Sequence, residues 1–109
     1  MRAFSMRALP LLPPSKFKII SINNEDIGAY LINKYSDYFN LDMLLIVKRY
    51  QNKGIGRQIV EKIKLLASKE NKSLKLSVIK TNPASNFYKH MGFQVAGEKE
   101  GSIKFEYAS

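Results

Sequence analysis

The segment Arg49–Ala67, RYQNKGIGRQIVEKIKLLA, joins two glycines to the start of an amphipathic helix. Its apolar residues recur at helical spacing and form one stripe: Ile55, Ile59, Ile63 and Ala67, with Val60 and Leu66 beside them. This pattern predicts a helix over about residues 54–69 that packs its stripe against a sheet.

The two glycines, Gly54 and Gly56, stand at the entrance of this helix. A glycine inside a helix costs roughly 0.5–1 kcal/mol relative to alanine, so the pair needs a compensating use. The first turn of a helix presents about four N–H groups without intrahelical partners and a partial positive charge, which together favour a bound phosphate. Glycines leave that backbone accessible, so the segment predicts a phosphate-binding turn.

Length and composition narrow the function classes. With 109 residues, 45% of them apolar, and no apolar run long enough to span a membrane, we expect one soluble, cytoplasmic domain. The absence of cysteine excludes disulfides, thiolate metal sites and cysteine nucleophiles. A single histidine, His90, excludes a His-rich zinc site within one chain, and we expect no metal.

The chain is strongly basic, with a formal net charge of +9. Ten lysines and arginines lie between residues 48 and 80, against the two acids Glu61 and Glu70, so the excess surrounds the glycine turn. This charge predicts an anionic partner: a polyphosphate cofactor, a nucleic acid or a membrane surface.

The first fifteen residues, MRAFSMRALPLLPPS, differ in composition from the rest and hold three of the four prolines. The segment is too short and proline-broken for a good secretory signal. We expect residues 1–15 to be a disordered or remnant tail and residues 16–109 to form the domain.

Alternating apolar residues predict three antiparallel strands at residues 17–22, 27–32 and 38–47, with turns at 23–26 and 33–37. In the last strand, Leu41, Met43, Leu45 and Val47 should share one face and Asp42, Leu44 and Ile46 the other, so we expect burial on both faces toward its end. After the helix come a strand at 74–79 and two strands near 93–97 and 102–108. The order βββαβαββ predicts a mixed, mostly antiparallel α/β (α+β) sheet.

A second helix is predicted between the strands at 74–79 and 93–97. Asn82 can cap it, Pro83 suits its first position, and residues 84–91 form its body. Gly92 can supply the left-handed residue that ends it.

Two motifs in this order resemble the GCN5-related N-acetyltransferase (GNAT) superfamily. QNKGIG, residues 51–56, matches the family's Gln/Arg-x-x-Gly-x-Gly/Ala acetyl-CoA loop, and NPASNFYKHMGF, residues 82–93, matches its second conserved segment. Other phosphate loops do not fit: Gly56 is followed by Arg57 rather than the Lys-Ser/Thr of a Walker loop, and position 59 is not the third glycine of a dinucleotide fingerprint. The resemblance implies the acyl-CoA N-acyltransferase fold from about residue 16 onward.

The resemblance also implies a coenzyme A site. Main-chain amides would hold the pyrophosphate, with Lys53 and Arg57 adding charge. The main chain near Ile46 and Val47 would pair with the pantetheine arm, and Asn82 would reach the same region or act only as a helix cap. The implied cofactor-binding residues are Ile46, Val47, Gln51, Asn52, Lys53, Gly54, Ile55, Gly56, Arg57 and Asn82.

For catalysis the resemblance implies Tyr88, because a protonated phenol can give its proton to a departing thiolate. A packing role in the core is its alternative, and Phe87 and Phe93 are expected in the core. Asp42 is the candidate base for the incoming amine, with a water chain to Tyr35 or Tyr38 as the alternative. We expect His90 to face solvent, since it lies two residues from Tyr88 on the helix.

Full members of the superfamily begin with a strand and two helices that form much of the acceptor site, and residues 1–15 are too few for these. The strand at 17–22 is then expected at a sheet edge. A homodimer that completes the site is favoured; a partner protein, or a truncated copy that binds acetyl-CoA weakly or serves a regulatory role, are the alternatives. The predicted function is an acetyl-CoA-dependent N-acetyltransferase. Nucleic-acid binding through Tyr35, Tyr38 and Phe39 is less expected.

Overall fold

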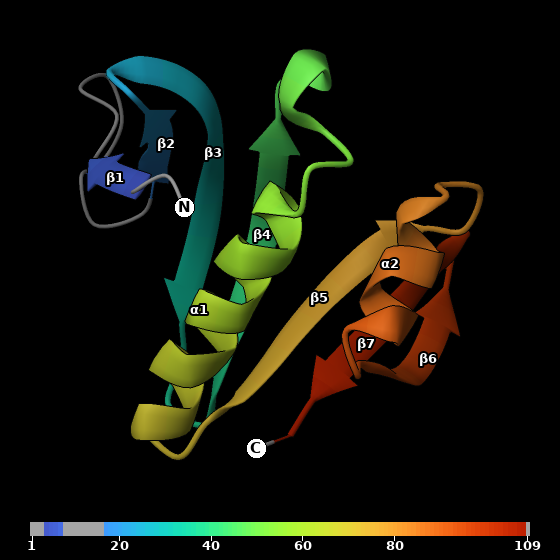
Figure 1. Cartoon of the computed structure of the whole chain (residues 1–109). Helices are drawn as coiled ribbons and strands as arrows, with labels where there is room; N and C mark the ends of the chain where they lie inside the picture. Colours follow the sequence, from blue (N-terminus) through green and yellow to red (C-terminus); the bar gives the residue numbers. More distant parts are fainter. Residues whose placement is uncertain (1–3, 8–16, 109) are drawn as a thin grey trace.

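The computed structural model describes residues 4–7 and 17–108. They form one sheet with strand order β1-β2-β3-β4-β5-β7-β6, and the predicted mixed α/β fold is confirmed (Figure 1). The strands are β1 Phe4–Arg7, β2 Phe17–Ile22, β3 Glu25–Lys34, β4 Tyr38–Ile46, β5 Ser73–Ile79, β6 Gln94–Lys99 and β7 Ser102–Tyr107. The helices are α1 Ile55–Lys69 and α2 Ala84–His90, and a short 3₁₀ turn, η1 Lys48–Tyr50, precedes α1.

The turn between β2 and β3 is tighter than the sequence predicted. Asn23 and Asn24 both have positive φ, 51° and 67°, as a two-residue hairpin turn requires. Strand β3 therefore begins at Glu25 rather than at Ile27, and the turn predicted over residues 23–26 is too long.

Strand β1 lies within the segment predicted to be a tail. It pairs antiparallel with β2, from Phe4 opposite Ile22 to Arg7 opposite Ile19. The expectation that residues 17–22 form the sheet edge is therefore wrong. Residues 1–3 and 8–15 of the predicted tail, and residue 16, lie outside the described residues, and the domain boundary at residue 16 stays a prediction.

Strands β4 and β5 are parallel neighbours over a short distance only. The pairs are Tyr38 with Ser73, Phe39 with Leu74 and Asn40 with Lys75. Beyond Asn40 the two strands diverge toward their C-terminal ends, and Figure 1 shows the resulting V with α1 on one arm and α2 near the other. We call this opening the β4–β5 wedge.

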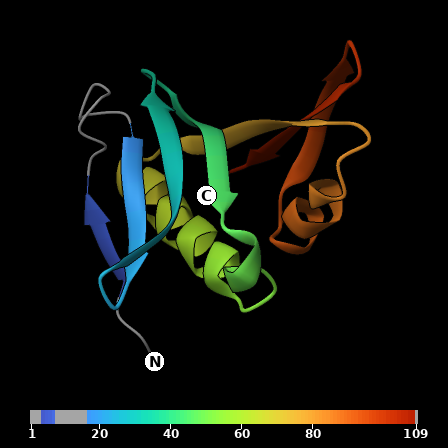
Figure 2. The same cartoon turned by 90° about the horizontal axis from the view of Figure 1, so that it is seen from above.

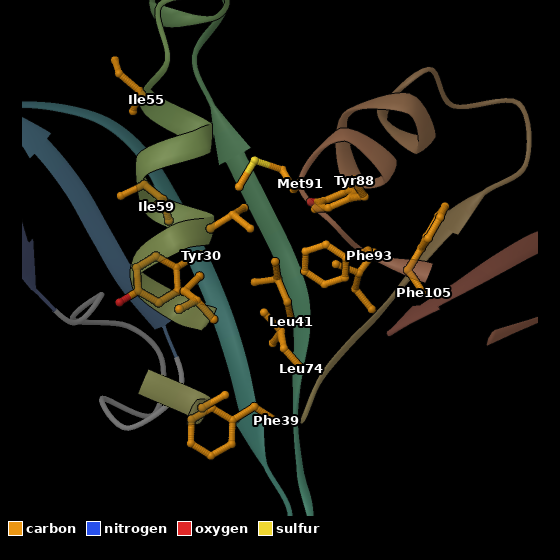
Figure 3. Close-up of a cluster of buried hydrophobic side chains, with 14 of the residues drawn as sticks. Tyr30, Phe39, Leu41, Ile55, Ile59, Leu74, Tyr88, Met91, Phe93 and Phe105 are labelled. Atoms are coloured by element: carbon orange, nitrogen blue, oxygen red, sulfur yellow. The ribbon is translucent and has the colours of Figure 1, made fainter. Parts of the chain in front are cut away.

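Both helices pack on the same side of the sheet (Figure 2). Their apolar faces meet side chains from the strands in one core, part of which is drawn in Figure 3. The predicted α1 stripe is confirmed by the buried residues Ile55, Ile59, Val60, Ile63 and Ala67, whereas Leu66 is 37% exposed.

A bulge in β4 overturns the predicted faces of that strand. Leu31 pairs with Met43 but Ile32 pairs with Leu41, so Asp42 is an extra residue that reverses the alternation. The core side therefore carries Phe39, Leu41, Leu44 and Ile46. Leu45 lies on the other side and is 58% exposed, so the prediction that the strand end is buried on both faces is wrong.

Candidate functional site

The glycine turn connects η1 to α1. Two of its residues adopt left-handed backbone conformations, Asn52 with φ of 61° and Gly54 with φ of 81°. Gly54 is the N-cap residue, and its carbonyl accepts a hydrogen bond from the Gln58 N–H at 3.1 Å. The turn therefore bends sharply just before α1 begins.

Six consecutive backbone N–H groups at this turn, those of residues 52–57, donate to no acceptor in the described part of the chain. The first turn of α1 contains no acid. A β carbon on Gly54 would meet nothing within 4 Å, so bare backbone is open to a ligand. The exposed Lys53 and Arg57 add positive charge. This donor set fits a diphosphate.

The open end of the β4–β5 wedge lies beside the same turn. The Val47 N–H donates to the Ile27 carbonyl at 2.7 Å, so it faces β3 rather than the wedge. Backbone groups alternate in direction along a strand, so Ile46 faces the side that β5 has left. The Ile46 carbonyl accepts a hydrogen bond from Gln51 Nε2 at 2.8 Å, which links the end of β4 to the turn. Of the two predicted backbone positions, Ile46 therefore faces the wedge.

Asn82 has the predicted capping contact. Its Oδ1 accepts a hydrogen bond from the Ala84 N–H at 2.9 Å, at the entrance of α2. Its amide nitrogen is exposed and donates to no described residue. Gly92, with φ of 93°, follows the end of α2 as predicted.

Tyr88 lies on the inner face of α2. Its ring makes edge contacts with Phe87 and Phe93, with centroids 5.0 and 5.5 Å apart. Burial raises the pKa of the Tyr88 hydroxyl above its ordinary value of 10.0. No described residue hydrogen-bonds this hydroxyl, yet no wholly buried side-chain polar atom among the described residues lacks a partner, so the oxygen reaches solvent. Figure 3 shows it directed toward β4.

Asp42 is exposed at the bulge of β4. Its two carboxylate oxygens accept hydrogen bonds from the side-chain amides of Asn33 and Asn40. Because Leu41 belongs to the core with Tyr88, Asp42 faces the opposite side of the sheet. The structure therefore places the predicted acid and base on opposite faces, near the wedge.

The sequence prediction missed the two asparagines that orient Asp42. The sequence carried no signal for them, because Asn33 and Asn40 become neighbours only when β3 and β4 pair and place them directly opposite each other. The predicted aromatic alternatives lie at its tip, where Tyr35 stacks on Tyr38 with centroids 4.7 Å apart. Phe39, the third aromatic residue considered for base stacking, has 0% exposure.

Three further observations bear on the predictions made from the sequence. His90 is exposed, as predicted. Among residues 4–7 and 17–108, no group of three or more His, Cys, Asp or Glu side chains is arranged to hold a metal. No helix in that part of the chain has the length and apolarity to cross a membrane.

Comparisons with solved structures agree with this fold. The chain aligns with the PaiA N-acetyltransferase of Thermoplasma acidophilum in complex with coenzyme A at a TM-score of 0.76 and 22% identity, covering 85% of this chain and 60% of that one. It also aligns with PH1933 of Pyrococcus horikoshii, at a TM-score of 0.76 and 20% identity, over 85% of this chain and 64% of that one. The chain thus spans about three fifths of the length of these proteins.

A shorter relative matches over its whole length. A GNAT family acetyltransferase of Elizabethkingia anophelis, with acetyl-CoA bound, aligns at a TM-score of 0.81 and 14% identity over 99% of this chain and 98% of that one. No curated protein matches the sequence significantly. A family model for the acetyltransferase (GNAT) domain matches residues 13–95. The chain belongs to the GNAT family of acetyltransferases.

Proposed function

We propose that this chain is an acetyl-CoA-dependent N-acetyltransferase that transfers acetyl directly to an amine. The observation that carries the proposal is the row of backbone amides at residues 52–57, which donate to no acceptor among the described residues and lie beside the open end of the β4–β5 wedge. The relatives with coenzyme A or acetyl-CoA bound support the same location, and one of them is nearly as short as this chain.

The proposed cofactor site uses the turn and the wedge together. The amides of residues 52–57 would hold the diphosphate, with the charges of Lys53 and Arg57 nearby. The Gln51 N–H already donates to the Lys48 carbonyl at 3.1 Å, so Gln51 would contribute through its side-chain bond to the Ile46 carbonyl instead. The main chain at Ile46 would pair with the pantetheine arm, Val47 would border it, and the exposed amide of Asn82 would donate to it from the α2 side.

The chemistry needs an acid and a base. Acetyl-CoA supplies an activated thioester. Asp42, held by two amides, would take a proton from the ammonium group of the acceptor, so that the neutral amine nitrogen bonds to the acetyl carbon. As the carbon–sulfur bond breaks, the Tyr88 hydroxyl would give its proton to the sulfur. The nitrogen, now bonded to the acetyl carbon, would lose its second proton, which restores the Tyr88 hydroxyl, and the proton on Asp42 would pass to solvent. Since the chain has no cysteine, we propose no acyl-cysteine intermediate.

We also propose that the chain forms a homodimer. Two large apolar side chains lie on the sheet side away from the helices, Leu45 at 58% and Ile79 at 65% exposure. A second copy covering this side would bury them and add walls to the space around Asp42. The cytoplasmic location stays a prediction.

Calorimetric titration with acetyl-CoA, combined with light scattering, tests these proposals. We expect micromolar binding to a dimer, followed by thiol release when primary amines are screened as acceptors. The alternative is a catalytically inactive relative: binding without thiol release from any amine would favour it, and no binding at millimolar acetyl-CoA would overturn the cofactor site.

A further inference from the structure

Glu25, the first residue of β3, is bonded to the segment that leads into the glycine turn. Its Oε1 accepts a hydrogen bond from the Tyr50 hydroxyl at 2.8 Å, and its Oε2 forms an ion pair with Arg49. Both partners belong to η1, and Gln51 follows directly. The Glu25 carboxylate therefore links the β2–β3 hairpin to η1, the segment directly before the glycine turn.

Apart from Glu25, the described contacts of η1 are backbone hydrogen bonds, the contact of Arg49 with the Tyr50 ring, and the packing of that ring against the core. The Tyr50 N–H donates to the Val47 carbonyl at 2.9 Å, and the guanidinium of Arg49 lies 5.6 Å from the centre of the Tyr50 ring. The Tyr50 ring also packs against the core. Glu25 thus bonds to the polar groups at the tips of both the Arg49 and the Tyr50 side chains.

The negative charge of Glu25 lies among basic side chains that would attract an anion. Lys48, Arg49, Lys53 and Arg57 are exposed around the turn and favour an anion there. A carboxylate beside Arg49 lowers the positive potential that a diphosphate would meet. Its geometric contribution must therefore outweigh this electrostatic loss if it helps binding.

We propose that Glu25 is a positioning residue for coenzyme A. By holding Arg49 and Tyr50, it fixes η1 so that the amides of residues 52–57 converge on one diphosphate. This inference rests on the proposed acetyl-CoA site, which it deepens by assigning a residue that the family motifs do not include.

Two variants separate geometry from charge. Glu25→Gln removes the charge of the carboxylate, and Tyr50→Phe removes one hydrogen bond with no change in charge. The matched control is Glu98→Gln in β6, where a carboxylate 3.3 Å from Lys80 Nζ is neutralised in an exposed ion pair. Calorimetry measures the Kd of coenzyme A. Native-state hydrogen exchange without ligand measures opening of η1 at its hydrogen-bonded amides, those of Tyr50 and Gln51, which donate to the Val47 and Lys48 carbonyls.

We expect both Glu25→Gln and Tyr50→Phe to weaken coenzyme A binding about fivefold and to speed exchange at the Tyr50 and Gln51 amides, while Glu98→Gln changes neither. Electrostatics alone would give tighter binding in Glu25→Gln and no change in Tyr50→Phe, and that result would overturn the inference. If the wild-type chain failed to bind coenzyme A, the proposed function would fail as well. Faster exchange in the variants would then mark Glu25 as a structural contact only.

Discussion

Gly28 and Gly56 are both glycines inside regular secondary structure, but they have opposite explanations. A β carbon on Gly28 would lie 2.1 Å from the carbonyl oxygen of Leu45 on the neighbouring strand. A β carbon on Gly56 would meet only the Phe87 ring, at 3.8 Å, which is ordinary contact. The folded chain therefore requires glycine at position 28 and has no requirement for it at position 56.

This difference separates folding from function. Gly56 lies in the first turn of α1, where glycine lowers helix stability relative to alanine. A destabilising residue that the protein's own packing does not demand points to something outside the chain. The adjacent amides without acceptors make a phosphate group the best explanation.

The largest effect should come from Gly28→Ala. The new methyl group would overlap the Leu45 carbonyl, so β3 and β4 would have to separate where they pair. We expect the free energy of unfolding to fall by about 3 kcal/mol, the upper range for overpacking. Chemical denaturation followed by circular dichroism measures this loss.

Gly97→Ala in β6 is the matched control. A β carbon at Gly97 would meet nothing within 4 Å, and this glycine has no positive φ. Its stability should stay equal or rise by about 0.4–1 kcal/mol, because alanine restricts the unfolded chain. Equal stability of the Gly28 and Gly97 variants would contradict the close approach of β3 and β4.

Gly56→Glu tests whether the glycine at position 56 serves coenzyme A binding rather than packing. A carboxylate in the first turn of α1 would occupy the proposed diphosphate position, so we expect coenzyme A affinity to fall about 100-fold or more. The same carboxylate interacts favourably with the helix dipole and replaces a glycine, so the melting temperature should rise. Calorimetry and thermal melts measure the two opposite changes.

Gly56→Gln separates charge from size in this test. The neutral side chain has nearly the same volume, so a smaller loss of affinity than in Gly56→Glu would identify charge repulsion as the main cause. Unchanged coenzyme A affinity in Gly56→Glu would refute the assignment of this turn.

The same contrast explains how much of the fold the sequence could predict. The spacing of apolar residues and the capping residues predicted α1, α2 and the left-handed conformation of Gly92 correctly, because each of these signals lies within a few neighbouring residues. The β4 faces were wrong because a bulge at Asp42 depends on pairing with β3, which alternation within one strand does not reveal. Strand β1 was missed because its partner β2, not its own short proline-flanked sequence, makes it a strand.

The candidate site follows the same rule. The glycine turn and the Asn82 cap could be predicted, since each is a contiguous motif with a backbone requirement. Glu25 and Asn33 could not, because they act on residues of other strands and turns. Their roles depend on hairpins that bring distant positions together.

Tyr88→Phe should have a smaller effect, confined to turnover. The hydroxyl has no hydrogen-bond partner among the described residues, so the free energy of unfolding and the coenzyme A affinity should stay nearly unchanged. Loss of a general acid should lower kcat about tenfold to 100-fold. Equal turnover in an assay of thiol release would remove Tyr88 from the mechanism.

The pH dependence sharpens this prediction. Burial raises the pKa of Tyr88, and the protonated form is the one that donates. Its contribution to kcat is therefore complete at neutral pH and is lost only as the pH rises through a value above 10.0. A wild-type decline near pH 8 that is absent in Tyr88→Phe would contradict this assignment.

The smallest effects are expected at Asn82, because this one side chain both caps α2 and is proposed to donate a hydrogen bond to coenzyme A. Asn82→Ala removes the Oδ1 that caps α2, so the free energy of unfolding should fall by about 1 kcal/mol. Asn82→Asp keeps an oxygen for the Ala84 N–H but loses the exposed amide donor. We therefore expect Asn82→Asp to retain stability while coenzyme A affinity falls about threefold, the value of one neutral hydrogen bond. Equal affinity in Asn82→Asp and the wild type would confine Asn82 to the cap, and would place it with Gly28 among the residues that the fold alone explains.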